Sequence, residues 1–415
     1  MGIVCYGDFS CNYWFKINEN NLTACGIVFF IYLISTMKKN YGFNDFKFFT
    51  EMSELASRHH SFDLSLGLPD FEIDPRLRHY LKESADVITH SYESLAGNPL
   101  LIENILQFNL KRTNRLELKR KEVNIVPCST FALYTSLKSI LEFGDEVIII
   151  QPSYYTYAPS IVLNGGVPVY YNLDNDFEID WEKLQNCISD KTKAIIINSP
   201  QNPTGKMWTA SDWEQLYQMI KNQEIYLISE EIYDIYCYDG ISHYSPFLHP
   251  ELKKRTFSIF SFGKMFHATG WKVSYLLASE ELLDNFRSHQ QYISYSSNAP
   301  CQYAIAKYLV VFDPADNQKI MQDKRNIFNE MIKDTPLQIE EKAEGGFFQL
   351  VNFRNVSKTM TDVEFSKWLT VEKKVSCLPL SAFYNSRQDS DYIRFSFAKR
   401  DDVIIQALEH LKKNL

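Results

Sequence analysis

Three features are missing from this sequence of 415 residues, and each absence excludes a class of protein. The eight cysteines form no C-x-x-C pair and no Cys/His cluster at metal-ligand spacing, so we expect no metal site and a reduced, cytoplasmic setting. There is no long basic run and the formal net charge is −8, which argues against a nucleic-acid partner and favours a small molecule. No apolar run reaches the roughly 18 residues of a membrane-spanning helix, so no membrane partner is expected.

The longest apolar run, ACGIVFFIYLI at residues 24–34, lies in an N-terminal extension covering residues 1–36. Its length suits a signal-peptide core, but only the basic residue Lys16 precedes it and no clear A-x-A cleavage pattern follows. We expect the extension to be disordered or not part of the native start, with ordinary protein sequence beginning at Met37. A targeting segment and an added surface element are the open alternatives.

From about residue 97 the sequence alternates short apolar stretches with stretches of helical spacing. Apolar residues recur at helical spacing in 130–141 and 209–222, whereas β-branched runs predict strands at 144–152, 192–200, 224–233, 256–262 and 271–279. Strands that are apolar throughout and separated by helices predict an α/β fold, with a mostly parallel sheet covered by helices on both faces.

The C-terminal part changes character. A helix is expected at 317–332, followed by strands in GGFFQLVNF (345–353), KVSCLPL (374–380) and YIRFSFA (392–398) and by a final helix. This pattern predicts a smaller α+β domain. We therefore expect a large domain at 81–300, a small domain at 301–415, and an N-terminal segment, 37–80, that joins the small domain.

Polar side chains follow three of the predicted strands at the point where each strand ends. In open α/β sheets, ligands bind beyond the carboxyl ends of the strands. The sequences there are NSPQNPTG, EEIY and SFGK, which bring together Asn202, Glu230, Tyr233 and Lys264. A solvated lysine explains Lys264 poorly, because it directly follows the buried strand TFSIFSF.

Ser129 and Thr130 in VPCSTFAL stand at the predicted start of a helix. Free backbone N–H groups and hydroxyls at a helix N-terminus suit a phosphate, although a plain capping role would also explain both residues. A phosphate site, an acid, a phenol and a lysine together are what pyridoxal 5'-phosphate (PLP) requires: the lysine forms a Schiff base, the acid keeps the pyridine nitrogen protonated, and the phosphate anchors the ring.

Four motifs carry a resemblance to a known family: SLGLPDF (65–71), NPTGK (202–206), SFGKMFHATGWKVSY (261–275) and YIRFSFA (392–398). From about residue 48 to the end, the chain resembles the fold-type I PLP-dependent aminotransferases of class I/II, especially the methionine and kynurenine (glutamine) transaminase group. The resemblance implies a seven-stranded sheet and a homodimer with shared active sites. It also implies ping-pong transfer of an amino group from a large, neutral amino acid, of the methionine, aromatic, kynurenine or glutamine type, to a 2-oxo acid.

The resemblance also implies a role for each motif position. Lys264 would carry the cofactor and move the proton between Cα and C4′, with Glu230 at the pyridine nitrogen and Tyr233 and Asn202 at the phenolic oxygen. Tyr154 would stack on the ring. The phosphate would be bound by Ser129, Thr130, Ser261 and Lys272, and by Tyr92 of the neighbouring subunit.

The substrate carboxylate would be bound by Arg394, whose planar fork suits bidentate recognition, with help from Asn202 and the backbone of Gly67. Taken alone, Tyr154 could be a core residue, Tyr92 could equally be structural or functional, and Arg394 could pair with any acid. An arginine in the middle of an apolar strand nevertheless usually has a functional or structural partner, because charged residues are rarely buried without one.

Three positions depart from the family pattern. Glu230 stands where the family normally has Asp, which keeps the charge but lengthens the side chain by one methylene. Cys128 and Ser129 replace the small Gly-Ala/Ser pair that opens the phosphate helix, and Ser274 replaces a glycine. None of these changes removes a chemical role.

Two rival functions stay open. A cysteine-conjugate or cystathionine-type β-lyase would use the same lysine and cofactor to eliminate a β-substituent. A non-catalytic binding or regulatory module of the same fold ranks lower, because the lysine is kept and the N-terminal DNA-binding region of such regulators is absent.

Overall fold

The computed structural model describes residues 45–415 apart from 89, 113 and 175, so the predicted extension 1–36 lies outside the described residues. Its largest element is a seven-stranded sheet in the order β2-β8-β7-β6-β5-β3-β4. The strands are β2 (Val123–Val126), β3 (Glu146–Gln151), β4 (Val167–Asn172), β5 (Thr192–Asn198), β6 (Tyr226–Glu230), β7 (Thr256–Ser261) and β8 (Ser274–Leu277). Strand β8 is antiparallel to both of its neighbours, β2 and β7, and every other pair in the sheet is parallel, which confirms the predicted mostly parallel sheet.

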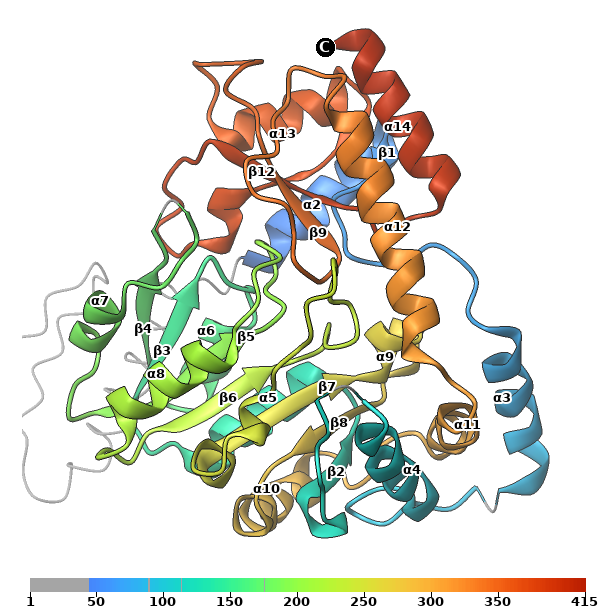
Figure 1. Ribbon diagram of the computed structural model, residues 1–415, viewed down its shortest axis with the longest axis vertical. Helices are drawn as coiled ribbons and strands as arrows, with labels where there is room; N and C mark the ends of the chain where they lie inside the picture. The colour runs from blue at the N-terminus through green and yellow to red at the C-terminus, as the bar shows by residue number, and fades with distance from the viewer. Residues whose placement is uncertain (1–44, 89, 113, 175) are drawn as a thin grey trace, which may run out of the picture.

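Alternate residues of the central strands face two different apolar cores, as the period of a β-strand requires. Ile196 and Ile228 pack in one core with helix α5 (Ser129–Ile140). Ile195 and Leu227 pack in a second core with helix α8 (Ala210–Ile220). The sheet is therefore covered on both faces, which explains why its strands are apolar at consecutive positions (Figure 1).

The C-terminal strands form a second, three-stranded antiparallel sheet in the order β11-β12-β9. Its strands are β9 (Phe348–Asn352), β11 (Leu378–Pro379) and β12 (Tyr392–Ser396). The predicted strand 374–380 divides in two, because β10 (Val375–Ser376) pairs instead with β1 (Phe62–Asp63). The N-terminal elements β1 and α2 (Asp45–Arg58) thus lie among C-terminal elements, where Figure 1 shows them in blue beside orange and red ribbons. The domain boundaries stay a prediction.

The remaining helices pack around these sheets. They are α3 (Pro75–Val87), α4 (Pro99–Leu110), α6 (Tyr157–Leu163), α7 (Trp181–Asn186), α9 (Phe262–Met265), α10 (Glu280–Ile293), α11 (Ala299–Leu309), α12 (Pro314–Ile332), α13 (Asp362–Val371) and α14 (Asp401–Asn414). Three of them, α3, α4 and α12, begin with a proline behind an Asp or Asn cap: Asp74, Asn98 and Asp313. The side chain of such a cap accepts hydrogen bonds from free N–H groups of the first turn. Proline suits the first position of the helix because it has no N–H group that would need a partner.

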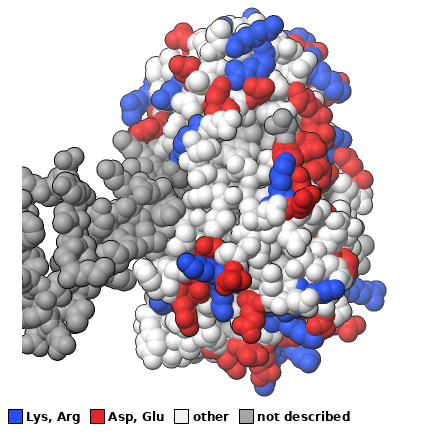
Figure 2. Space-filling view, turned by 90° about the vertical axis from the view of Figure 1, so that its left-hand side faces the viewer, with Lys and Arg blue, Asp and Glu red and all other residues white. Residues whose placement is uncertain are grey.

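Across the described part of the chain, no helix is long and apolar enough to cross a bilayer. On the face that Figure 2 shows, acidic and basic side chains are interspersed toward the two ends of the molecule. A band of mainly uncharged surface lies between them.

Candidate active site

Lys264 lies on the short helix α9, directly after β7, at the carboxyl edge of the large sheet. Its Nζ donates a hydrogen bond of 2.9 Å to the carbonyl oxygen of Gly67. Burial lowers the pKa of Lys264 to about 8; the charge of Glu230 opposes this shift, and the charges of Arg394 and Lys272 add to it. The amine is therefore much closer to neutrality than an exposed lysine, and the charges of Glu230 and Arg394 both reach it.

Glu230 is the last residue of β6 and is buried, with 6% of its surface exposed. Burial raises the pKa of its carboxyl group, whereas hydrogen bonds from Tyr157 and Ser129 and the charge of Lys264 lower it. The Tyr157 hydroxyl donates directly to Oε2 of Glu230. The side chain of Glu230, one methylene longer than the Asp of the family pattern, is thus held by the hydroxyl groups of Tyr157 and Ser129.

Sequence reasoning missed Tyr157. It is the first residue of α6, three positions after Tyr154, and it is fully enclosed in the core. The spacing of three residues between Tyr154 and Tyr157 is the feature of the sequence that could have pointed to Tyr157, since residues three apart lie on one side of a helical turn. The two rings lie 6.3 Å apart, and Tyr154 itself is half-buried.

Arg394 lies in the middle of β12 and is 2% exposed. Its Nη1 donates to Oδ1 of Asn202 at 2.7 Å, and its Nη2 donates to the carbonyl oxygen of Ser65. Its Nε is buried and has no hydrogen-bond partner among the described residues. Burial lowers the pKa of Arg394 to about 9. An unpartnered buried donor is costly, and a bound carboxylate would satisfy it.

Two aromatic rings lie over the guanidinium group of Arg394. The ring centroids of Phe348 and Phe383 are 3.9 Å and 4.9 Å from its Cζ atom. Phe348 also explains the glycine at position 67, because a Cβ atom there would lie 2.3 Å from Cζ of Phe348. Only glycine therefore allows this close approach.

Tyr233 is buried beside Lys264, with its ring centroid 5.8 Å from the lysine Nζ and 4.9 Å from the ring of Phe347. Burial raises the pKa of its hydroxyl group above the ordinary value, and the charge of Glu230 adds to that shift. The predicted phenol thus lies close to both the predicted base and the predicted acid.

The predicted phosphate ligands lie around the N-terminus of α5 and the end of β7. Ser129 is the first residue of α5, and the side chain of its N-cap, Cys128, makes no capping bond. The backbone of Cys128 is extended (φ −167°), a conformation that any residue adopts, so the absence of glycine there causes no strain. The hydroxyl of Ser274, another departure from the family, donates to Ser261 at 3.3 Å. Thr130 and Lys272 are exposed.

These groups fit PLP. An uncapped helix N-terminus suits a phosphate, a buried carboxylate suits a protonated ring nitrogen, and a lysine with a lowered pKa suits Schiff-base formation. Tyr92 is not part of this cluster. It is 84% exposed and its ring lies 5.9 Å from that of Tyr295.

The fold and the site define a PLP-dependent enzyme, and comparison with known proteins narrows the class. The family model for aminotransferase class I and II matches residues 59–411. Methionine aminotransferase of Escherichia coli (strain K12) is 34% identical over 373 residues, which cover 88% of this chain and 95% of the relative. Kynurenine–oxoglutarate transaminase 3 of Homo sapiens is 26% identical over 398 residues, 87% of each chain.

A solved structure from Escherichia coli, reported with a methionine aminotransferase function, superimposes with a TM-score of 0.85 at 34% identity. The match covers 88% of this chain and 96% of that one. The chain belongs to the class I and II aminotransferase family. It is a PLP-dependent transaminase, as the resemblance implied, and the predicted fold, enzyme class and cofactor are confirmed.

Proposed function

We propose that this aminotransferase takes its amino group from a large, neutral amino acid of the methionine, aromatic, kynurenine or glutamine type. A 2-oxo acid then accepts the group in the second half of a ping-pong cycle. The proposal rests on the convergence of three residues at the edge of the sheet: the charges of Glu230 and Arg394 both act on the amine of Lys264.

Lys264 would hold the cofactor and act as the base that moves the proton at the substrate Cα. A useful general base has a pKa near the working pH, and burial brings that of Lys264 to about 8. PLP, when bound, supplies an electron-accepting ring. Glu230 would keep its nitrogen protonated, and the hydroxyls of Tyr157 and Ser129 would hold the carboxylate in place.

Arg394 would bind the substrate carboxylate and so orient Cα toward Lys264. Among the residues that the structure describes, no carboxylate forms an ion pair with Arg394, although the charge of Asp63 acts on it from farther away. Its contacts with the amide of Asn202 and the carbonyl of Ser65 fix the direction of the fork. Phosphate binding by Ser129, Thr130, Ser261 and Lys272, and stacking by Tyr154, complete the proposed site.

The substrate class is supported by the aromatic surroundings and by the relatives. Phe348 and Phe383 contact Arg394, and Tyr154 and Tyr155 lie together with ring centroids 4.5 Å apart. Such surfaces suit an apolar or aromatic side chain. The similarity to a methionine aminotransferase and to a kynurenine–oxoglutarate transaminase points the same way.

A homodimer is supported by the exposed aromatic patch around Tyr92. Tyr92 and Tyr292 are 84% and 86% exposed, and Ile293 and Tyr295 are each 48% exposed. A hollow of about 680 Å³ next to Tyr92 is lined by Glu93, Ser94, Ser294, Tyr295 and Ser296. An exposed aromatic patch with a polar rim is typical of an interface, and a second copy of this chain would cover it. A cytoplasmic location is supported only by the free state of the five described cysteines: Cys128, Cys187, Cys237, Cys301 and Cys377.

The test is a panel of amino donors and 2-oxo acids assayed with the holoenzyme. We expect methionine or aromatic donors to give the highest kcat/KM, with aspartate far behind. A cysteine S-conjugate in the same panel tests the β-lyase alternative. Release of pyruvate and ammonia faster than amino transfer would favour the lyase and contradict the proposal.

A further inference from the structure

We propose that Asp362 is a positioning residue for the carboxylate-binding site. It holds the short helix η6 (Leu380–Phe383) so that the ring of Phe383 lies over the guanidinium group of Arg394. The inference rests on the proposed function, because it takes Arg394 as the group that binds the substrate carboxylate.

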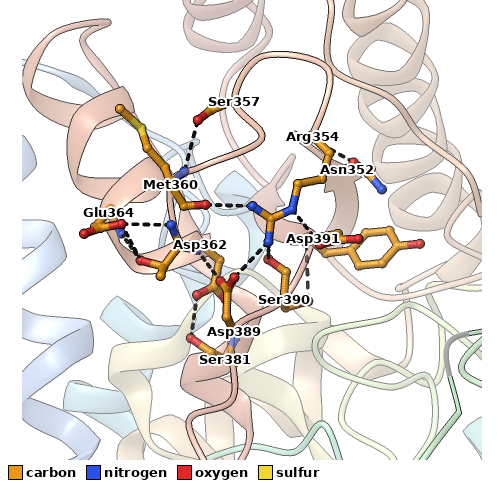
Figure 3. A network of polar contacts seen from close by, with 12 residues as sticks. Asn352, Arg354, Ser357, Met360, Asp362, Glu364, Ser381, Asp389, Ser390 and Asp391 are labelled. Atoms are coloured by element: carbon orange, nitrogen blue, oxygen red, sulfur yellow. Dashed lines mark hydrogen bonds and ion pairs between the residues drawn. The ribbon is translucent and has the colours of Figure 1, made fainter.

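The carboxylate of Asp362 is buried, and each of its two oxygens accepts a hydrogen bond from η6. Asp362 is the first residue of α13 and is 1% exposed. Its Oδ2 accepts the backbone N–H of Ser381 at 2.7 Å, and its Oδ1 accepts the Ser381 hydroxyl at 2.9 Å (Figure 3). A buried carboxylate is costly unless it is well hydrogen-bonded, and both oxygens here bind the same residue.

Capping of α13 does not explain Asp362, because other residues cap that helix. The side chain of Thr361 accepts the N–H of Glu364, and Glu364 accepts the N–H of Thr361 at 2.9 Å. This reciprocal pair is a capping box, which satisfies the free N–H groups at the start of the helix. The carboxylate of Asp362 is therefore left to bind η6.

Helix η6 connects Asp362 to the site within three residues. Ser381 receives the carboxylate, and Phe383 places its ring centroid 4.9 Å from Cζ of Arg394. The carbonyl oxygen of Phe383 accepts the N–H of Ser153 at 2.9 Å, next to the proposed ring-stacking residue Tyr154. The single turn is thus hydrogen-bonded on one side to α13 and on the other to the loop that follows β3.

A network of charges fixes Asp362 relative to the strand that carries Arg394. The N–H of Asp362 donates to Asp389 at 2.8 Å. Asp389 in turn pairs with Arg354 at 2.8 Å, and Arg354 also binds Asp391 at 2.6 Å, directly before β12 begins (Figure 3). The start of α13, helix η6 and the start of β12 therefore form one connected unit.

Phe383 matters because the guanidinium group lacks an acidic partner among the described residues. An aromatic ring over a guanidinium stabilises the charge without neutralising it and keeps water away. If η6 moves, Arg394 gains water and rotational freedom, both of which weaken the binding of an incoming carboxylate. The predicted consequence is a loss of carboxylate affinity with little change in the chemical step.

The test measures binding of 3-phenylpropionate, which has a carboxylate but no amino group, to the holoenzyme by calorimetric titration. Asp362→Ala should weaken binding about tenfold, the loss typical of hydrogen bonds to a charged group, and raise KM while kcat changes less than about threefold. Glu364→Gln perturbs the same end of α13 without touching η6 and is the matched control, with an unchanged dissociation constant.

Coupling identifies the route of the effect. Because Asp362 acts through Phe383, the variant Asp362→Ala/Phe383→Leu should bind no more weakly than Phe383→Leu alone. Additive losses, or parental affinity in Asp362→Ala, would overturn the inference. If Asp362→Ala does not fold, Ser381→Ala removes one of the two bonds; it should weaken binding about threefold, and unchanged affinity would overturn the inference.

Arg394→Lys separates this inference from the proposed function. If Arg394→Lys loses affinity and Asp362→Ala does not, only the positioning role of Asp362 is wrong. If Arg394→Lys binds 3-phenylpropionate as tightly as the parent, the role of Arg394 in the proposed function is wrong and the inference is overturned with it.

Discussion

The amine of Lys264 binds the carbonyl oxygen of Gly67, a residue 197 positions earlier in the chain. Gly67 lies so close to Phe348 that a methyl group would overlap the ring, and Phe348 in turn lies over Arg394. The N-terminal segment therefore joins the proposed base to the proposed carboxylate-binding group. Position 67 requires glycine because of this close contact and not because of its backbone conformation, since its φ is not positive.

Gly67→Ala should weaken substrate binding. The new Cβ would lie 2.3 Å from Cζ of Phe348, so the ring must move away from Arg394. Overpacking of this kind costs about 1–3 kcal/mol, and we expect KM for the amino donor to rise about tenfold or more. Gly270→Ala is the control, because a Cβ atom there has no atom within 4 Å beyond the two neighbouring residues in the chain. Steady-state kinetics of both variants decide the matter, and equal KM values would contradict the assignment of Gly67.

The reactivity of Lys264 in the cofactor-free protein should depend on pH with a midpoint near 8. Its pKa is lowered from 10.5 to about 8, so the neutral amine predominates above about pH 8. Acetylation of Lys264, followed by mass spectrometry and normalised to the exposed Lys413, measures the midpoint. A midpoint near 10.5 would show that burial does not act on this amine.

The same shift has a consequence for stability. Between pH 8 and 10.5 the unfolded chain binds more protons at this lysine than the folded protein does. The contribution of Lys264 should therefore make the cofactor-free protein more stable as the pH rises through that range. Lys264→Met should abolish this part of the pH dependence in denaturant titrations.

Glu230 should act through its charge. Glu230→Gln keeps the size but removes the charge, and should lower kcat about 100-fold, as expected for loss of one preorganised electrostatic group. Glu230→Asp should cost much less. Tyr157→Phe, which removes the hydroxyl that donates to Glu230, should fall between the two.

Single-turnover kinetics with each variant measures the chemical step directly. If Gln performs as well as Glu, Glu230 is a structural acid. Glu231, which is buried and has its Oε2 2.7 Å from Nε2 of His243, would then become the candidate for the partner of the cofactor's ring nitrogen.

Tyr92 should serve the neighbouring subunit. Mixing Lys264→Ala protomers with Tyr92→Phe protomers gives hybrid dimers. If Tyr92 acts across the interface, both lesions fall in one active site and the other site is intact, so the hybrid regains one fully active site. If Tyr92 serves its own subunit instead, each site carries one lesion and neither is intact, which would contradict the prediction. A fully active protein that sediments strictly as a monomer would contradict the role.

The positions of Lys264, Glu230 and Asn202 could be predicted because the carboxyl ends of parallel strands meet at one edge of the sheet. A local pattern sufficed, since each residue lies at the end of an apolar run or within four residues of it. The antiparallel direction of β8 could not be predicted, because a strand buried on both faces has the same pattern in either direction.

The surroundings of Arg394 were beyond sequence reasoning for a different reason. Phe348 reaches Arg394 through the pairing of β9 with β12, whose register no local pattern encodes. Phe383 lies on a single helical turn that is too short to show periodicity. Tyr157 and Asp362 likewise owe their contacts to residues 73 and 19 positions away.

Every role proposed for the site depends on Lys264 carrying the cofactor. Reduction of the holoenzyme with borohydride would fix PLP covalently to the lysine that holds it, and peptide mass spectrometry would then locate the pyridoxyl group. We expect the pyridoxyl group on Lys264 and no pyridoxyl group in Lys264→Ala treated in the same way. A pyridoxyl group on a different lysine, or none on Lys264 in a fully active preparation, would contradict it.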